Sequence, residues 1–260
     1  MAIDTENRFL LPPGTTSVWY GRTGDINEAV PSLDRWLTAS EKLRFGRYRF
    51  EVDRRSFAAG RILLKNALSY YGPNTPPTDW RIVPDEMGAL ALDPAQNPQR
   101  IHINLSRRRQ WIACVLSHQR CGVDIEDISR KIDIEGVARA VLTESELDEM
   151  AALTALERRR FFFEHWCLKE AYLKALGVGF HMEPTRIRVR PGPLMETVAP
   201  VPAGTADRAT RFRFALFTPG PTHLLAVTHE AADEEPVERD SAPPKVRFDV
   251  RDCHELPFLR

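Results

Sequence analysis

The sequence predicts an α+β fold built from two similar halves. A helical stretch is followed by closely spaced strands twice, once on each side of about residue 120. The strands are short and joined by tight polar turns, which favours antiparallel pairing. A chain of 260 residues is long enough for two halves that each bury a core. We therefore expect a three-stranded antiparallel sheet with packed helices in each half.

The N-terminal half begins with a predicted strand at residues 17–20 and a short helix at 32–37. Helices are predicted at about 40–50 and 53–71, where Gly72 and Pro73 end the helical pattern. Residues 80–83 and 89–92 are expected to form strands of a hairpin-bearing region. Three more strands, at 101–105, 111–116 and 122–125, follow in quick succession and predict one antiparallel meander.

The C-terminal half is predicted to contain two helices and a second meander. Thr143 and Glu146 fit a capping box that opens a helix through about residue 158, and a second helix spans 161–176 and ends at Gly177. Strands are expected at 186–190, 211–217 and 223–228. We expect domains at residues 1–119 and 120–230, followed by an acidic, poorly packed tail at 231–260.

Composition excludes several classes of protein. The formal net charge is zero, so no overall field favours nucleic acid or an anionic membrane surface. No stretch approaches the roughly 20 apolar residues of a membrane span, and residues 1–8 do not resemble a signal peptide. The cysteines show no zinc-finger spacing. We expect a cytoplasmic protein with reduced thiols.

The predicted helix at 161–176 combines a broad apolar face with charged residues. Glu170 and Lys174 lie one turn apart beside that face. They could be an ordinary surface ion pair, which contributes only about 0.2–0.5 kcal/mol. Lys169 falls inside the apolar face, where an ammonium group must reach solvent or find an anionic partner. Two lysines and a glutamate on this helix suggest a phosphate and a metal nearby.

A second group of acidic residues lies on the predicted strand near residue 124. Asp124 and Glu126 point to the same face of that strand. Two carboxylates this close are unfavourable unless a cation or a shared proton neutralises them, although a solvated strand end would also accommodate them. An all-oxygen site suits Mg²⁺ or Mn²⁺. Glu170 could supply a third carboxylate if its helix packs over the strand.

These two segments together resemble a known signature. Residues 122–126, Gly-Val-Asp-Ile-Glu, followed by residues 166–174, Trp-Cys-Leu-Lys-Glu-Ala-Tyr-Leu-Lys, are similar to the 4'-phosphopantetheinyl transferase superfamily, of the surfactin-synthetase-activator (Sfp) type. The resemblance covers roughly residues 15–230. It implies a monomer of two fused, similar halves related by pseudo-two-fold symmetry. It also implies transfer of 4'-phosphopantetheine from coenzyme A to a serine of an apo acyl or peptidyl carrier protein, with release of 3',5'-ADP.

The resemblance implies roles for residues of the second half. Asp124, Glu126 and Glu170 match the carboxylates that hold Mg²⁺ on the pyrophosphate, and Glu170 also matches a residue proposed to deprotonate the acceptor serine. Lys174 matches the lysine at the leaving group, and Lys169 would lie near the same phosphates. Glu146 is a second candidate base, although a role limited to capping its helix is at least as consistent with its position.

In the first half, the resemblance predicts a binding site for the nucleotide of coenzyme A. Residues 104–111 align with a family motif in which Arg107 replaces the histidine that faces the 3'-phosphate, and Ser106 keeps the serine. An arginine provides a permanent charge and a bidentate donor pair there. A family Gly-Lys-Pro appears here as Gly88-Ala89-Leu90, so we expect that lysine contact to be lost. The remaining candidates for the 3'-phosphate come from a basic run: Lys42, Arg44, Arg47 and Arg55.

Two other functions share part of this pattern. A Mg²⁺-dependent hydrolase of nucleotide pyrophosphates would need the carboxylates but no protein acceptor. A non-catalytic module that binds coenzyme A or a carrier protein would have no reason to retain all the carboxylates and both lysines. The sequence does not identify the carrier protein, and it leaves Glu170, Glu146 and water open as the base.

Overall fold

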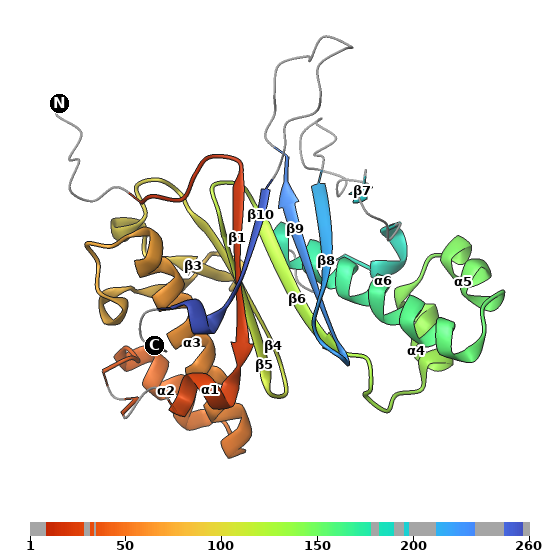
Figure 1. Cartoon of the computed structure of the whole chain (residues 1–260), viewed down its shortest axis with the longest axis horizontal. Helices are drawn as coiled ribbons and strands as arrows, with labels where there is room; N and C mark the ends of the chain where they lie inside the picture. Colours follow the sequence, from red (N-terminus) through yellow and green to blue (C-terminus); the bar gives the residue numbers. More distant parts are fainter. Residues whose placement is uncertain are drawn as a thin grey trace, which may run out of the picture. The chain divides into compact units, whose positions relative to one another are not determined.

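The computed structural model of the chain describes residues 9–28, 32–33, 35–177, 182–189, 195–197, 212–231 and 247–256. It confirms the α+β class, but each main sheet has four strands where we predicted three. The chain divides into two compact units, an N-terminal unit of Met1–His118 with Phe248–Arg260 and a C-terminal unit of Gln119–Arg247. Figure 1 shows that each unit contains its own sheet and helices. The pseudo-two-fold relation of the halves stays a prediction, as does their assignment as domains.

The N-terminal unit is built on a four-stranded sheet of order β10-β1-β5-β4. The strands β4 and β5 form an antiparallel hairpin, and β5 also pairs antiparallel with β1. The long helix α3 packs against this sheet, and the predicted strands near 82 and 90 form a separate two-stranded hairpin, β2-β3. The elements are β1 (Thr15–Arg22), α1 (Thr23–Glu28), α2 (Ala39–Arg47), α3 (Glu51–Tyr71), β2 (Ile82–Pro84), β3 (Leu90–Leu92), β4 (His102–Arg108), β5 (Trp111–Ser117) and β10 (Arg247–Asp252), with 3-10 turns at Pro77–Asp79, Pro94–Gln96 and Cys253–Glu255.

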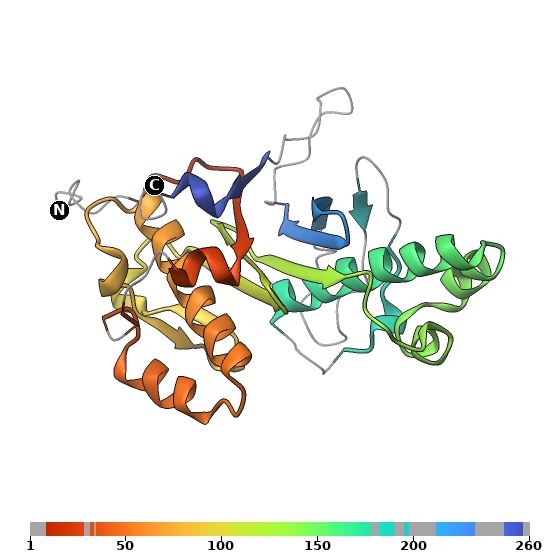
Figure 2. The same cartoon turned by 60° about the horizontal axis from the view of Figure 1, so that its bottom comes forward.

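The C-terminal unit has a second four-stranded sheet of order β6-β9-β8-β7. The first strand of each unit pairs with the later strand of a hairpin, β1 with β5 and β6 with β9, so the two units share this connectivity. Helix α6 runs along β6 (Figure 2), and α4 and α5 contact α6. The elements are β6 (Cys121–Asp127), α4 (Ile134–Val141), α5 (Glu144–Ala151), α6 (Ala155–Leu176), β7 (Met195–Thr197), β8 (Phe212–Gly220) and β9 (His223–Glu230), with a 3-10 turn at Pro184–Arg186.

The predicted apolar face of α6 is its buried face. Phe162, Leu168, Tyr172 and Leu173 are buried in the core of the C-terminal unit, and other apolar side chains of the helix pack at its edge. The helix ends at Gly177, whose φ of 69° is the left-handed conformation that glycine adopts at low cost. The helix is thereby fixed at the end nearest Lys174.

Several predicted elements differ from the structure. The strand β6 does not continue the meander of β4 and β5, because it pairs with β9, about 100 residues further along the chain. The helix predicted from Thr143 to about residue 158 is interrupted after Ala151, because Thr154 and Glu157 form a second capping box that starts α6. The described part of 32–37 is a turn closed by a Trp36 to Leu33 backbone hydrogen bond of 3.0 Å.

The strand predicted at 186–190 is not present among its described residues. Pro184–Arg186 form a 3-10 turn, and the amide of Val189 donates to the side chain of Glu146 at 3.0 Å in place of a strand partner. Ile187 and Val189 are nevertheless buried, as the alternating pattern predicted.

The end of the chain also differs from the poorly packed tail that we predicted. Strand β10 pairs in the N-terminal sheet, and Cys253 and Leu256 belong to the core of that unit. Residues 232–246, which carry most of the acidic and proline-bearing sequence, lie outside the described residues. Among the described helices, none is long and apolar enough to cross a membrane.

Gly122 permits a close approach of β6 to α6. A methyl group at this position would lie 2.7 Å from the backbone nitrogen of Ala175, and closer still to the carbonyl oxygen of Ala171. We expect Gly122→Ala to lower the free energy of unfolding by about 3 kcal/mol, because backbone atoms on both sides must shift. Chemical denaturation should measure the loss. Gly46→Ala, in exposed helix α2 with no atom within 4 Å, is the control and should stabilise by about 0.5–1 kcal/mol.

Candidate active site

Two of the predicted metal ligands lie on the face of β6 that α6 covers. Asp124 and Glu126 are 5% and 6% exposed. They share their face with Gly122, which α6 approaches through Ala171 and Ala175. The thiol of Cys167 on α6 donates to the backbone oxygen of Asp124 at 3.3 Å. The helix therefore packs over the strand, as the sequence required for Glu170 to join these carboxylates.

Glu170 lies on α6 within electrostatic reach of Asp124. Burial raises the pKa of the Glu170 carboxyl, the negative charge of Asp124 raises it further, and Lys174 lowers it in part. A carboxyl group with a raised pKa becomes easier to ionise when a cation binds beside it. The third predicted ligand is thus placed where a divalent cation would favour its charged form.

Lys174 pairs with a strand residue, Asp124. Its Nζ lies 2.6 Å from Oδ1 of Asp124 and donates to the backbone oxygen of Val123 at 3.2 Å. The Lys174 side chain is 29% exposed, so it is partly accessible from solvent. Lys174 therefore balances the charge of Asp124, and the interpretation of Glu170 and Lys174 as a simple surface ion pair does not describe this contact.

The carboxylate set fits a hard divalent cation in its donor chemistry. Asp124, Glu126 and Glu170 offer oxygen atoms only, which Mg²⁺ and Mn²⁺ prefer. Arg130 lies 3.5 Å from the Glu126 carboxylate. Among the described residues, only Asp252, Cys253 and His254 bring three potential donor atoms within 4.8 Å of one another. The donor atoms of Asp124, Glu126 and Glu170 are therefore more widely spaced than this. A cation at the β6 carboxylates would accordingly retain water ligands, as Mg²⁺ commonly does.

Lys169 and Glu146 form a buried ion pair. The Lys169 Nζ lies 2.5 Å from Oε2 of Glu146 and donates to the backbone oxygen of Val141 at 2.7 Å. Both side chains are 1% exposed. Burial raises the pKa of Glu146, but hydrogen bonds from Lys169 and the Thr143 amide outweigh burial, so the pKa is lowered. This geometry disfavours Glu146 as a base and Lys169 as a phosphate ligand, because each is bonded to the other in the core.

Some of the predicted nucleotide-binding residues form a basic cluster in the N-terminal unit. The guanidinium groups of Arg44 and Arg107 lie 5.9 Å and 5.7 Å from the centre of the Phe57 ring. Arg107 also donates to the hydroxyl of Tyr48 at 3.4 Å. Burial raises the pKa of Tyr48, but hydrogen bonds from Arg107 and Arg44 lower it by more. Arg107 and Arg44, distant in sequence, are thereby brought to one place.

The other residues predicted to bind the nucleotide do not all lie in this basic cluster. Arg47 lines an open hollow of about 620 Å³ together with Arg44 and Tyr48. Arg55 is 65% exposed and pairs with Glu51 at 3.1 Å, which fits a solvated helix face. Lys42 is exposed on α2, and Ser106 is buried on β4 beside Arg107.

Two residues of this basic cluster, Tyr48 and Phe57, were missed by the sequence analysis, and Arg61 was noted only as part of a local excess of basic residues. The Arg61 guanidinium lies 5.1 Å from the centre of the Phe57 ring and 2.9 Å from the carboxylate of Glu41. The spacing of Phe57 and Arg61, one helical turn apart, is a pattern that could have indicated them.

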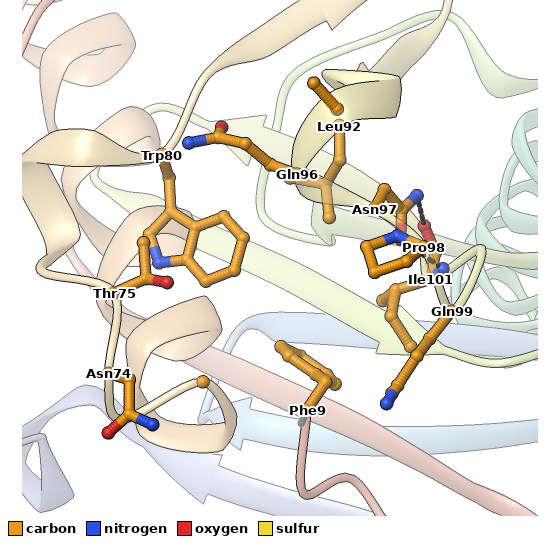
Figure 3. Close-up of a pocket in the computed structure, with 12 residues that line it drawn as sticks. Phe9, Asn74, Thr75, Trp80, Leu92, Gln96, Asn97, Pro98, Gln99 and Ile101 are labelled. Carbon is orange, nitrogen blue, oxygen red and sulfur yellow. Dashed lines mark hydrogen bonds between the residues drawn. The ribbon is translucent and has the colours of Figure 1, made fainter. Parts of the chain in front are cut away.

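A pocket in the N-terminal unit is separate from all the predicted site residues. It has a volume of about 160 Å³ and is lined by Phe9, Trp80 and the loop from Ala95 to Gln99 (Figure 3). Two of its side-chain amides are used within the protein: Asn97 exchanges hydrogen bonds with the backbone of Ile101, and Gln96 bonds the backbone of Asp79 and Arg81. The pocket is therefore a packing feature of the β2-β3 region.

Comparison with known proteins identifies the C-terminal segment. Residues 120–218 match the family model described as the 4'-phosphopantetheinyl transferase superfamily. This match covers β6 and α6, which carry the carboxylates and Lys174. The resemblance predicted from the sequence is confirmed for this segment.

Three curated relatives bear names of the same activity. The chain is 29% identical to the 4'-phosphopantetheinyl transferase HetI of Nostoc sp. over 58% of this chain and 63% of that protein. It is 37% identical to the 4'-phosphopantetheinyl transferase gsp of Aneurinibacillus migulanus over 32% of this chain and 34% of that protein. It is 27% identical to a phosphopantetheinyl transferase of Thraustochytrium sp. over 85% of this chain and 82% of that protein. The first two matches therefore span less than two thirds of those relatives.

Proposed function

We propose that this chain is an enzyme of the 4'-phosphopantetheinyl transferase superfamily, whose family model its residues 120–218 match. It transfers 4'-phosphopantetheine from coenzyme A to a serine of an apo acyl or peptidyl carrier protein and releases 3',5'-ADP. The observation that carries this proposal is the packing of α6 on β6 within the matched segment, with Lys174 2.6 Å from Asp124 and Glu170 within electrostatic reach of Asp124.

The carboxylates are proposed to hold the divalent cation. Asp124, Glu126 and Glu170 would bind Mg²⁺, or Mn²⁺ in its place. The bound cation supplies positive charge that offsets the charge of the pyrophosphate. Lys174 is proposed to stabilise the negative charge that develops on the departing 3',5'-ADP, since its side chain is partly accessible at the same place.

The acceptor serine must lose a proton as its oxygen attacks the β-phosphate of coenzyme A. Glu170 is the proposed acceptor of this proton, either directly or through water. The burial of Glu146 in a pair with Lys169 removes the support for the alternative.

The basic cluster of the N-terminal unit is proposed to bind the nucleotide of coenzyme A. Arg107 and Arg44 present two permanent charges, and a guanidinium group can form paired hydrogen bonds with a phosphate. Arg47 shares the hollow with Arg44 and is included in the proposal. Ser106, Lys42 and Arg55 stay predictions from the resemblance.

Cellular setting and assembly complete the proposal. We propose a monomer that works in the cytoplasm on a carrier protein. The four cysteines, Cys114, Cys121, Cys167 and Cys253, are buried and form no disulfide, which suits a reducing compartment.

A mass measurement on a carrier protein tests the activity. The full chain is incubated with coenzyme A, Mg²⁺ and several apo carrier proteins, and each carrier is then weighed by mass spectrometry. Addition of one phosphopantetheine group per carrier is the expected result, and unchanged masses for all carriers would contradict the proposal. Release of 3',5'-ADP without any carrier would instead favour the hydrolase.

Substitution of Arg107 tests the nucleotide site. We expect Arg107→Ala to raise KM for coenzyme A about 10-fold to 100-fold, since a charged hydrogen bond to phosphate is lost, while kcat changes little. Arg107→Lys should recover part of the affinity because it keeps the charge but not the paired donors. Steady-state kinetics with a saturating carrier protein measures both constants. Equal KM values for all three proteins would refute the assignment of Arg107.

A further inference from the structure

The two units contain the same buried polar arrangement at corresponding places. In the C-terminal unit, Thr143 is the N-cap of α5, and the Glu146 carboxylate accepts from the Thr143 amide at 2.8 Å. In the N-terminal unit, Thr38 is the N-cap of α2, and Glu41 accepts from the Thr38 amide at 2.9 Å. The sequences share the pattern Leu-Thr-x-Ser-Glu at 37–41 and 142–146.

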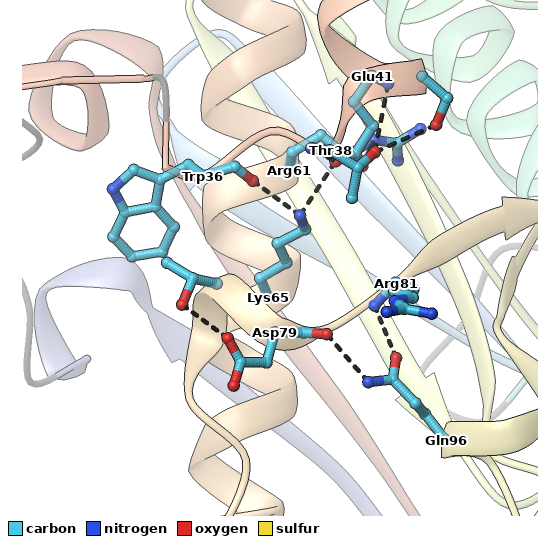
Figure 4. A network of polar contacts seen from close by, with 10 residues as sticks. Trp36, Thr38, Glu41, Arg61, Lys65, Asp79, Arg81 and Gln96 are labelled. Carbon is cyan, nitrogen blue, oxygen red and sulfur yellow. Dashed lines mark hydrogen bonds and ion pairs between the residues drawn. The ribbon is translucent and has the colours of Figure 1, made fainter.

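A lysine of the following long helix completes each arrangement. Lys65 of α3 donates to Glu41 at 3.0 Å and to the backbone oxygen of Trp36 at 2.7 Å (Figure 4). Lys169 of α6 donates to Glu146 at 2.5 Å and to the backbone oxygen of Val141 at 2.7 Å. In both cases the carbonyl belongs to the residue two positions before the threonine. We call these arrangements the Glu41–Lys65 lock and the Glu146–Lys169 lock.

A third capping box shows that the lysine is not needed for capping. Thr154 and Glu157 at the start of α6 make the same reciprocal bonds, with Thr154 N to Glu157 at 2.9 Å. Glu157 is exposed, and no ion pair with it is recorded among the described residues. The buried lysines of the two locks thus have a role beyond capping the N-terminus of a helix.

The Glu146–Lys169 lock joins four segments at one point. Glu146 belongs to α5, Lys169 to α6, and Val141 to the end of α4. The second carboxylate oxygen of Glu146 accepts from the amide of Val189, which follows α6 in the chain, at 3.0 Å. The position of α6 along its axis is therefore fixed in the C-terminal half of the helix, immediately before Glu170.

We infer that Glu146 and Lys169 are positioning residues that set α6 so that Glu170 and Lys174 face Asp124. Lys169 precedes Glu170 directly and lies five residues before Lys174 on one rigid helix. A small rotation or slide of α6 would move both groups away from the strand, and hydrogen-bonded partners that orient metal ligands commonly change metal affinity by about 10-fold to 100-fold when removed. The Glu41–Lys65 lock holds α3 in the same way, but the position after Lys65 is Asn66, so that helix has no corresponding carboxylate.

The two locks differ in a way that provides a matched control. The other oxygen of Glu41 pairs with Arg61 at 2.9 Å, so Lys65→Met leaves Glu41 with a cation. In the C-terminal unit, Glu146→Gln combined with Lys169→Met removes both charges together and leaves no unpaired ion in the core. Each variant thereby breaks a lock without burying an uncompensated charge.

The test measures metal binding and turnover separately. Mn²⁺ is titrated into each full-length protein in the presence of coenzyme A, and bound metal is followed by water proton relaxation. We expect the double variant E146Q/K169M to bind Mn²⁺ about 10-fold more weakly and the K65M protein to bind it within about twofold of the unsubstituted chain. In turnover, we expect the fold decrease in kcat of the double variant to exceed its fold increase in KM for coenzyme A.

Three outcomes overturn the positioning role: wild-type Mn²⁺ affinity and kcat in the folded double variant, an equal loss of Mn²⁺ affinity in K65M, or no Mn²⁺ binding by the unsubstituted chain. Circular dichroism confirms folding, and the single variant K169M replaces the double variant if that one unfolds, because Glu146 then keeps the amides of Thr143 and Val189 as donors. The kinetic measurement rests on the proposed function, whereas Mn²⁺ binding does not. Mn²⁺ binding without transfer would refute the transferase and leave the lock supported.

Discussion

Replacement of Asp124 by alanine is expected to abolish transfer while the protein stays folded. Asp124 is the only carboxylate on β6 that also pairs with Lys174 among the described contacts, so its removal disturbs a metal ligand and the lysine at the leaving group together. We expect kcat to fall about 1,000-fold or more. Carrier-protein mass spectrometry at fixed times gives the rate, and thermal unfolding reports the fold.

The fold should tolerate this change because Lys174 is partly exposed. Once Asp124 is removed, the ammonium group can turn toward solvent and is not left as a buried unpaired charge. Asp127 offers a matched control on the same strand. Its carboxylate accepts from the amide and hydroxyl of Ser129 at 2.9 Å and 2.5 Å. Asp127→Asn therefore alters the turn after β6 and not the pairing of Asp124 with Lys174. A transfer rate for Asp124→Ala equal to that of the unsubstituted chain would refute the metal assignment.

Substitution of Lys174 by methionine is expected to lower kcat about 100-fold and to change KM for coenzyme A much less. A donor that acts mainly on charge developing in the transition state contributes to kcat, and loss of one such donor typically costs about 100-fold to 1,000-fold. Methionine keeps much of the length and apolar character of the lysine stem, so the packing of α6 should persist. Steady-state kinetics on one carrier protein separates the two constants.

Lysine chemistry provides the control for this second prediction. Lys174→Arg keeps the positive charge at the end of the helix, and we expect it to recover part of the rate. A KM increase equal to the loss in kcat for Lys174→Met would contradict a role in the transition state and would place the lysine in ground-state binding of coenzyme A.

The sequence predicted local structure and the carboxylate pattern well, because both depend on short spacings. The periodicities of β6 and α6 placed Asp124 and Glu126 on one strand face and the apolar stripe on the buried side of the helix. The interruption between α5 and α6 was also encoded locally, in Thr154 and Glu157, but was overlooked inside a continuous helical pattern.

Short spacings in the sequence could not predict which distant segments pair with one another. The partner of β6 lies about 100 residues away in β9, and a strand's periodicity does not specify which sheet it joins. The apolar surroundings of Lys169 required an anionic partner, yet only the packing of α5 against α6 identifies Glu146 as that partner. The neighbouring position of Arg44 and Arg107 likewise depends on how α2, α3 and β4 pack.

The return of the last residues to the N-terminal unit affects how the protein can be made. Strand β10 completes the sheet of the N-terminal unit. Cys253 packs against Gly21, and a larger residue at position 21 would collide with the Cys253 side chain. During synthesis, residues 9–118 leave the ribosome long before 247–256, so their sheet lacks an edge strand and part of its core until residues 247–256 have also been made. A shortened gene ending near residue 230 would therefore yield an incomplete N-terminal unit, and a fusion partner is better attached at the N-terminus than within this last segment.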